Sequence, residues 1–357
     1  MCLSASEQTW PTGNSPHIPS INILDDDSLL DIFYLYRPPI FDGDENVDVC
    51  IEGGKRWDRE LWWYKLAQVC RRWRNLILGS ASYLDLCLVC TYGTPAADML
   101  AHSPPLPLVI DYYHKHWDLT AEDEEGIIIA LEQRHRVRRV RLWMPILNLQ
   151  KLIMAIDDEY PMLEYLIVEP PIEDTSSALV LPETFQAPHL RHLSLKGFVL
   201  PRGSRLLTTA VGLVMLCLHI KHPSAYFQPN TLLHWLSFMP QLEMLIVISF
   251  PIPSRDVERQ LRHLPIMTHV TLPNLRSFEF QGVSAYLEAV VRRIITPHLE
   301  KLSLEFFKKL SFFVPSILQF LNTTENLRFD SVLVQFSGKR FTWGRIFVPV
   351  RSGCMPL

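Results

Sequence analysis

From residue 137 onward, the chain repeats the pattern L-x-x-L-x-L, and this repeat limits its possible folds more than any other feature. In one copy, Leu163, Leu166 and Val168 follow Pro161, and most other copies follow a proline at the same distance. The copies recur at intervals of roughly 23 to 33 residues, which gives each copy room for one supersecondary unit. A single unit of this kind cannot bury its apolar edge, so neighbouring copies must stack on each other. The first positions of the copies are Val137, Leu163, Leu190, Leu213, Leu242, Leu275 and Leu299.

Each copy predicts a short strand followed by a returning segment. The apolar positions within a copy alternate at period two, whereas residues 147–158, 232–238 and 285–295 have a helix-like pattern. The repeat resembles that of leucine-rich-repeat proteins but lacks their usual asparagine. The equivalent positions hold Pro171, Phe198, Lys221, Phe250, Val283 and Phe307. The resemblance implies an irregular leucine-rich-repeat-like solenoid with short parallel strands over residues 87–336, followed by a C-terminal tail at 337–357.

In strands of this pattern, the leucines point into the solenoid, and the residues between them point to the opposite face. The middle of that face is predicted to be apolar and its ends charged, which is the usual anatomy of a binding site. The candidate substrate-binding residues are Arg139, Arg141, Trp143, Tyr165, Ile167, Met215, Met244, Ile246 and Ile248. The predicted face also carries Glu169, His192, Ser194, Lys196, Cys217, His219, Ser277, Glu279, Gln281, Lys301, Ser303 and Glu305. Two alternatives stay open: a return helix or the C-terminal segment covers the face, or the strands are buried on both faces, as parallel strands often are.

Two amphipathic stretches lie near the N-terminus. Residues 62–78, WWYKLAQVCRRWRNLIL, predict one helix that ends at Gly79. Its apolar face would hold Trp62, Leu66, Val69, Cys70, Trp73 and Ile77. Residues 21–36 carry aspartates at 25–27, which favour a helix start, and Pro38 ends the helix after an apolar stripe. The stripe consists of Leu29, Ile32, Phe33 and Tyr36. Residues 37–60 between the stretches are rich in glycine and acidic residues, and predict a flexible inserted loop.

The two stretches together carry L-L-x-I-F and then L-A-x-V-C-R-x-W-R, and this order resembles the F-box, in particular that of mushroom-type fungal proteins. The resemblance covers residues 21–86 and implies a small all-α domain that docks on the Skp adaptor of an SCF ubiquitin ligase, which in turn binds the cullin. The adaptor-binding residues that it implies are Leu24, Leu29, Leu30, Ile32, Phe33, Leu66, Val69, Cys70 and Trp73. Trp73 is the expected aromatic anchor. The family usually has proline where this chain has Asp25.

The expected fold class is therefore α/β, with the small helical domain preceding the solenoid. The resemblance implies a non-enzymatic substrate receptor that takes part in protein degradation by holding an unknown protein substrate near the ligase. The alternative is a ligase-independent protein-interaction scaffold with a degenerate F-box, and copurification with the Skp adaptor and cullin discriminates between the two. The chain lacks G-x-S-x-G, H-E-x-x-H and a dinucleotide-binding glycine run, so neither an enzyme nor a cofactor is expected.

Composition agrees with one small and one larger domain, because 357 residues with 48% hydrophobic content can bury a large core. The net charge of −4 gives no global electrostatic case for nucleic acid or for an anionic membrane. The basic run at 134–141 lies close to the acidic residues at 122–125, which favours a solvated strand face over a nucleic-acid site.

Seven scattered cysteines do not form a disulfide framework and suit a reducing compartment, the cytoplasm or the nucleus. The pair Cys87 and Cys90 has only His114 and His116 nearby, so half-buried cysteines in a strand at 84–89 are favoured over a zinc site. Residues 1–20 lack a signal-peptide pattern and predict a disordered lead. The last four residues, from Cys354, formally match a C-a-a-X prenylation box, but their proline fits it badly, and no membrane partner is expected.

Overall fold

The structure is a computed structural model that describes residues 23–37, 62–113, 119–171, 178–201, 203–220, 222–249, 269–307, 315–324, 333–337 and 343–348. The chain divides into two compact units, Met1–Leu86 and Cys87–Leu357, called here the helical unit and the sheet unit. The predicted disordered lead and nearly all of the predicted acidic loop lie outside the described residues, as does Cys354.

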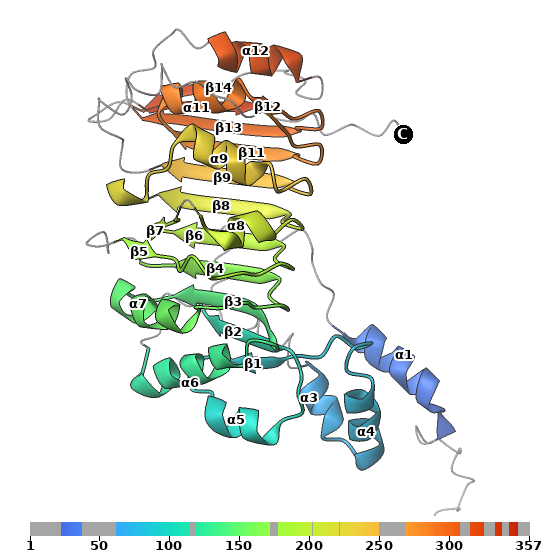
Figure 1. The fold of residues 1–357 in the computed structure, drawn as a ribbon. Coiled ribbons are helices and arrows are strands. Elements are labelled where there is room, and N and C mark those ends of the chain that lie inside the picture. The colour runs from blue at the N-terminus through green and yellow to red at the C-terminus, as the bar shows by residue number, and fades with distance from the viewer. Residues whose placement is uncertain are drawn as a thin grey trace, which may run out of the picture. The chain divides into compact units, whose positions relative to one another are not determined.

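The helical unit contains α1 (Asp26–Tyr36), α3 (Trp62–Ala67) and α4 (Arg71–Gly79) among its described residues (Figure 1). Helix α1 begins as predicted, because the Asp25 carboxylate accepts a hydrogen bond of 2.7 Å from the backbone N–H of Ser28. This bond lowers the pKa of the Asp25 carboxyl group. The helix ends at Tyr36, with Arg37 as its C-cap, next to the predicted stop at Pro38.

The prediction of one continuous helix over 62–78 is wrong, because the chain breaks between α3 and α4. Cys70 has an extended backbone, and its Sγ accepts a hydrogen bond from the backbone N–H of Trp73, so it is the N-cap of α4. The break turns Val69 outward, with 61% of its surface exposed, instead of onto the apolar face. Gly79 is the last helical residue rather than the residue after the helix, and Ser80 is the C-cap.

The interior of the helical unit holds Leu29 and Phe33 of α1 and Trp73 and Ile77 of α4. The rings of Phe33 and Trp73 meet edge to face, with 4.9 Å between their centroids. Leu84, at which the strand at 84–89 was predicted to begin, belongs instead to a turn and is fully buried. The next residue, Asp85, has a positive φ of 52°, and its carboxylate binds Arg37 at 2.7 Å. The first strand therefore begins only at Leu88.

The sheet unit is an α/β structure with a large, mostly parallel sheet, as the repeat predicted. In the described residues this sheet has eleven strands, in the order β1-β2-β3-β4-β6-β8-β9-β11-β13-β15-β14. Each of the seven copies of the repeat contributes one parallel strand: β3 (Val137–Trp143), β4 (Tyr165–Glu169), β6 (His192–Lys196), β8 (Met215–Ile220), β9 (Met244–Ser249), β11 (Ser277–Gly282) and β13 (Lys301–Phe307).

Strands at both ends of the sheet lie outside the copies of the repeat. The parallel strands β1 (Leu88–Cys90) and β2 (Leu108–Tyr112) precede the first copy. At the other end, β14 (Leu333–Ser337) and β15 (Trp343–Val348) pair antiparallel, and β15 also pairs antiparallel with β13. The segment that we predicted to be a C-terminal tail therefore contributes the strand β15. The repeat could not reveal this strand, because an antiparallel hairpin does not have the L-x-x-L-x-L pattern.

Helices connect the strands. In the described residues they are α5 (Ala96–His102), α6 (Ala121–Glu132), α7 (Ile146–Ala155), α8 (Arg205–Thr209), the 3-10 helix η3 (Pro223–Ala225), α9 (Pro229–Leu236), α11 (Ser284–Val291) and α12 (Pro315–Thr323). Helices α7, α8, α9 and α11 lie on the same side of the sheet (Figure 1). The predicted helices at 147–158 and 232–238 largely coincide with α7 and α9.

Two pairs of short strands lie outside the large sheet. Strands β5 (Leu179–Val180) and β7 (Phe198–Val199) pair in parallel, and so do β10 (Val270–Thr271) and β12 (Ile294–Ile295). The helix predicted over 285–295 therefore ends early, since its last two residues belong to β12.

The core of the sheet unit lies between the large sheet and the helices that connect its strands. Two ladders of apolar residues cross the strands in register and are buried along their whole described length. One ladder consists of Val140, Leu166, Leu193, Leu216, Leu245, Phe278 and Leu302; the other consists of Leu142, Val168, Leu195, Leu218, Val247, Phe280 and Leu304. Each buried side chain of this size contributes about 1.5–3 kcal/mol of hydrophobic stabilisation, which explains why the pattern fixes the fold.

Several ionisable side chains of the sheet unit are buried, and burial raises their pKa values. Burial raises the pKa of the Cys90 thiol from 9.0 to about 12, and the pKa of the Tyr160 hydroxyl from 10.0 to about 12. Burial also raises the pKa values of Tyr112, Tyr226 and Tyr286. Each of these groups therefore keeps its proton to a higher pH in the folded chain than in the unfolded chain.

Below about pH 9, we expect these groups to leave the free energy of unfolding unchanged. From about pH 9 to about pH 12, we expect the free energy of unfolding to fall steadily. The reason is that the unfolded chain releases these protons first, and ionisation then favours unfolding. Chemical denaturation at about pH 8 and about pH 10.5 measures the difference. In Cys90→Ala, the decrease near pH 9 to 10 should be shallower. A stability that stays constant or rises over this interval would contradict the prediction.

Candidate protein-interaction sites

Exposed apolar side chains are concentrated on the described part of the helical unit. Leu35 is 81% exposed, Ile23 75% and Val69 61%. The complete set there is Ile23, Leu24, Ile32, Tyr34, Leu35, Tyr36, Tyr64, Val69 and Tyr83. Isolated exposed apolar residues are ordinary, but these residues together form an extensive exposed apolar surface on one small helical unit.

The structure separates the predicted adaptor-binding residues into three groups. Leu24, Ile32 and Val69 are exposed, and Leu30, Leu66 and Cys70 are partly accessible. Leu29, Phe33 and Trp73 are buried. The expectation that Trp73 contacts a partner directly is therefore corrected, because its ring packs against Phe33 and joins α4 to α1. Sequence reasoning missed Leu35, although its position three residues after Ile32 on the same helix was a usable signal.

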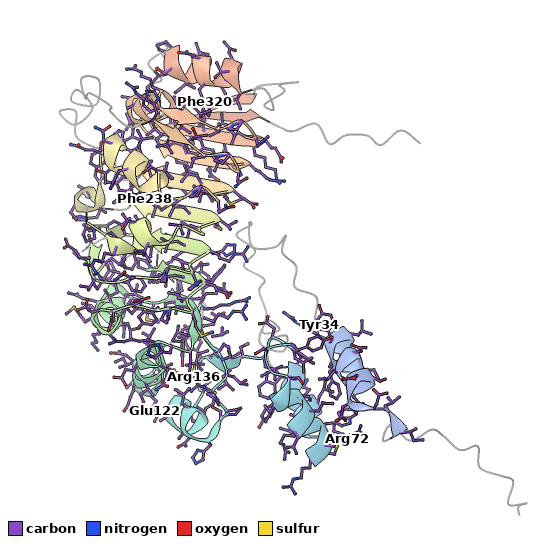
Figure 2. The ribbon with its side chains drawn as sticks, turned by 45° about the vertical axis from the view of Figure 1, so that its right-hand side comes forward. Tyr34, Arg72, Glu122, Arg136, Phe238 and Phe320 are labelled. Carbon is purple, nitrogen blue, oxygen red and sulfur yellow. The ribbon has the colours of Figure 1, made fainter. Side chains whose placement is uncertain are left out.

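Arg72 fixes the start of α1 next to α4. Its guanidinium donates two hydrogen bonds to the Asp26 carboxylate, at 2.7 and 3.0 Å, and a third of 2.7 Å to the Leu24 carbonyl oxygen. Figure 2 labels Arg72 on α4 and Tyr34 on α1. Together with the cap formed by Asp25, these bonds hold the exposed Ile23 and Leu24 beside α4. A hollow of about 720 Å³ lies between α1 and residues 78–83.

The face of the sheet opposite the buried ladders is called here the open face. Its side chains form three rows across the strands and alternate with the buried leucines. The first row is Arg139, Tyr165, His192, Met215, Met244, Ser277 and Lys301; the second is Arg141, Ile167, Ser194, Cys217, Ile246, Glu279 and Ser303; the third is Trp143, Glu169, Lys196, His219, Ile248, Gln281 and Glu305. The rows contain all of the residues that the repeat predicted for this face.

Met215, Met244, Ile246 and Ile248 form the apolar patch at the middle of the open face. All four are partly accessible, unlike the buried residues Leu216, Leu245 and Val247 next to them in their strands. They are therefore not packed inside the core, and the alternative of strands buried equally on both faces does not describe this part of the sheet. Cys217 lies in the same region but is only 5% exposed.

The predicted residues on the first strands of the repeat differ in accessibility. Arg139, Arg141, Trp143 and Ile167 are partly accessible. Tyr165 is only 9% exposed, and its ring centroid lies 5.2 Å from that of His192. Tyr165 therefore offers little surface to a ligand, contrary to its prediction as a contact residue.

A polar network joins the strands before the apolar patch, and its carboxylates are Asp111 and Glu169. The Asp111 carboxylate accepts a hydrogen bond of 3.0 Å from Arg141 Nη1, and both side chains of this pair are largely buried. Arg141 also lies 4.9 Å from the centre of the Tyr113 ring, as in a cation–π contact. Its Nε is buried and has no hydrogen-bond partner in the part of the chain that the structure describes.

Glu169 is the second centre of the polar network. It accepts hydrogen bonds from the Tyr113 hydroxyl at 3.2 Å and from the Ser194 hydroxyl at 3.3 Å. Lys196 Nζ lies 3.6 Å from the same carboxylate. Sequence reasoning missed Asp111 and Tyr113 because they belong to β2 and its end, before the first copy of the repeat. The apolar run at 108–110 could have revealed the strand.

The far end of the open face is acidic and polar. Glu279 is in register with Ile246 of the apolar patch, and its carboxylate accepts a hydrogen bond of 3.1 Å from Gln281. Among the described residues, no cation forms an ion pair with Glu279. The open face thus changes along the sheet from a basic and aromatic end, through the apolar patch, to a polar end that carries Glu279, Glu305 and Lys301.

The cysteines show no sign of a metal centre in the part of the chain that the structure describes. Cys87 and Cys90 are buried, and the described residues contain no cluster of three or more metal-ligating side chains. His114 and His116 lie outside the described residues. Because the Cys90 pKa is raised to about 12, its thiol stays protonated near neutral pH and is a poor ligand and nucleophile.

No model of a known protein family matches this chain, and comparison with curated proteins finds no similar sequence. None of the helices in the described segments is both long enough and apolar enough to cross a membrane. The candidate sites therefore rest on the geometry of the two units alone.

Proposed function

We propose that the chain is the substrate-recognition subunit of an SCF-type ubiquitin ligase, in which the helical unit docks on the Skp adaptor and the sheet unit binds a protein substrate. The observation that carries this proposal is the concentration of exposed apolar residues on the helical unit that contains the F-box-like pattern. In this role the chain makes no chemical bond itself. It brings the substrate to the ligase, in the cytoplasm or the nucleus, through the adaptor and the cullin.

The division between buried and exposed residues supports docking by the helical unit. Leu29, Phe33 and Trp73 hold the helices together, while Ile32 and Val69 from the same two motifs remain at the surface. A fixed interior beneath an apolar exterior is what a preorganised docking surface requires, because little conformational entropy is then lost on binding.

The sheet unit supports a role in recognition. We interpret it as an irregular leucine-rich-repeat-like solenoid, since each copy adds one parallel strand and the leucine ladders replace an asparagine ladder. Its open face offers an apolar patch between polar ends, which is the arrangement of a protein-binding surface rather than of a catalytic centre.

One observation favours a second candidate, a ligase-independent scaffold that uses the same open face. Asp25 stands where the related family usually has proline, and it caps α1 through the hydrogen bond to Ser28. A charged residue at this position adds a desolvation cost to docking if the adaptor covers it. The two candidates differ in whether the chain binds the Skp adaptor.

We expect Val69→Asp to weaken binding to a purified Skp adaptor about thirtyfold or more, equivalent to about 2 kcal/mol, because it places a charge in an apolar interface. Isothermal titration calorimetry of the full chain measures the change. Leu147→Asp is the matched control, since Leu147 is 74% exposed on α7 in the sheet unit. If the wild-type chain binds the adaptor and folded Val69→Asp binds it equally well, the docking surface is wrong. If the wild-type chain does not bind, the scaffold is favoured.

A further inference from the structure

We propose that the open face binds an amphipathic segment of its protein partner in one direction, with an acidic residue at the Arg141 and Lys196 end, apolar residues on the apolar patch, and a basic residue at Glu279. This inference rests on the substrate-binding role proposed for the sheet unit. It specifies the chemistry of the bound segment and the order of its charges.

The apolar patch is continuous across two neighbouring strands. Met215 is in register with Met244, and Ile246 and Ile248 follow Met244 at alternate positions of β9. Neighbouring strands lie about 4.8 Å apart, so these side chains are close enough to contact one apolar side chain of a partner together. Because they are already partly buried, their conformations are restricted before binding.

The polar network gives the first end of the face its preference for an acidic group. The cations there are Arg139, Arg141 and Lys196, against the two carboxylates of Asp111 and Glu169. Both carboxylates already accept hydrogen bonds, whereas Arg141 Nε is a buried donor without an acceptor among the described residues. The Arg141 side chain is 15% exposed, so a carboxylate of the partner can approach the accessible part of its guanidinium group. The distance of 3.6 Å between Lys196 and Glu169 leaves the ammonium group able to bind a second carboxylate.

Glu279 gives the other end its preference for a basic group. It lies directly beside Ile246 in the neighbouring strand. Glu305 lies one strand further from the apolar patch, so we assign the contact with the partner's cation to Glu279. A lysine or arginine of the partner can lay its aliphatic stem on the apolar patch and place its charged head at the Glu279 carboxylate.

Strand spacing sets the separation of these groups in the partner. The distance from Lys196 on β6 to Ile248 on β9 is two strand spacings, about 10 Å. The distance from β9 to β11, which carries Glu279, is one more spacing of about 5 Å. An extended segment covers about 10 Å in three residues, whereas a helix needs about seven. The spacing between acidic and apolar residues in a bound peptide therefore reports its conformation.

The inference is tested by selecting peptides that bind the full-length chain from a random library of displayed 16-residue peptides. A helical peptide of this length spans about 24 Å. Enriched peptides should carry an acidic residue, then apolar residues, then a basic residue. A synthetic peptide of the most enriched sequence should bind at least about tenfold tighter than the same peptide with its acidic and basic residues exchanged, which corresponds to about 1.4 kcal/mol. Ile246→Asp should weaken its binding by a similar factor.

Glu279→Lys supplies the sharpest comparison, because it should reverse the preference between the two peptides. Glu122→Lys is its matched control and should change neither affinity; Glu122 is exposed on α6, where Figure 2 labels it. The inference is overturned if no peptide is enriched, if the enriched peptides have no charge order, or if Glu279→Lys leaves the preference unchanged. Binding of the Skp adaptor is measured on the same proteins. If the wild-type chain binds the adaptor but the peptide selection fails, only this inference is rejected. If the wild-type chain does not bind the adaptor, the ligase role is rejected instead.

Discussion

Trp73→Ala is expected to destabilise the helical unit by about 3–5 kcal/mol, which is the usual cost of removing a buried tryptophan. Trp73 is only 9% exposed, and its edge-to-face contact with Phe33 is one of the contacts that join α4 to α1. Such a loss is comparable to the total stability of many small domains. Hydrogen exchange of the full chain measures the effect, because amides in α1 and α4 should lose protection while those in the strands of the sheet unit keep it.

Two comparison variants separate folding from docking. Trp73→Phe keeps an aromatic ring against Phe33 and should lose less stability than Trp73→Ala. Val69→Asp should keep the protection of α1 and α4, because Val69 lies on the surface. Any loss of adaptor binding in Trp73→Ala would then reflect unfolding rather than a missing contact. Full protection of α4 in Trp73→Ala would show that Trp73 does not hold the helices together.

The sequence predicted only some of the helix starts in the helical unit. The three aspartates at 25–27 correctly placed the start of α1, because N-capping depends on residues close in sequence. The break before α4 was not predicted, since the apolar spacing of residues 62–78 continues across it. Cysteine is an unusual N-cap, and its role depends on the direction in which its side chain points.

The repeat predicted the sheet well for a different physical reason. Each copy buries its leucines against its neighbours, so burial and alternation within one copy specify strand, face and register together. The strands outside the copies, β2 and β15, could not be found in this way. For the same reason the sequence placed the apolar patch but missed the Asp111 partner of Arg141, which depends on packing between segments about 30 residues apart.

Asp111→Ala is expected to destabilise the sheet unit by about 3–5 kcal/mol, because it removes the carboxylate partner of a largely buried guanidinium. The Asp111 side chain is 6% exposed and that of Arg141 15%, so water screens their interaction only weakly. The second Asp111 carboxylate oxygen also accepts a hydrogen bond of 3.1 Å from the backbone N–H of Tyr113. Asp111→Asn should cost less than Asp111→Ala, because an amide retains one acceptor and the shape of the side chain. Chemical denaturation of the single variants measures both costs.

The double variant Asp111→Leu/Arg141→Met tests whether the cost comes from the uncompensated charge. Replacing both members of a buried ion pair with apolar residues of similar size is often neutral or stabilising, so the double variant should be more stable than Asp111→Ala. It should nevertheless weaken the preference for peptides with an acidic residue at this end, because the guanidinium is gone while Lys196 remains. A double variant that is as unstable as Asp111→Ala would show that the carboxylate acts through its bond to the Tyr113 backbone. A cost below about 1 kcal/mol for Asp111→Ala, the value typical of exposed pairs, would show that solvent screens the pair.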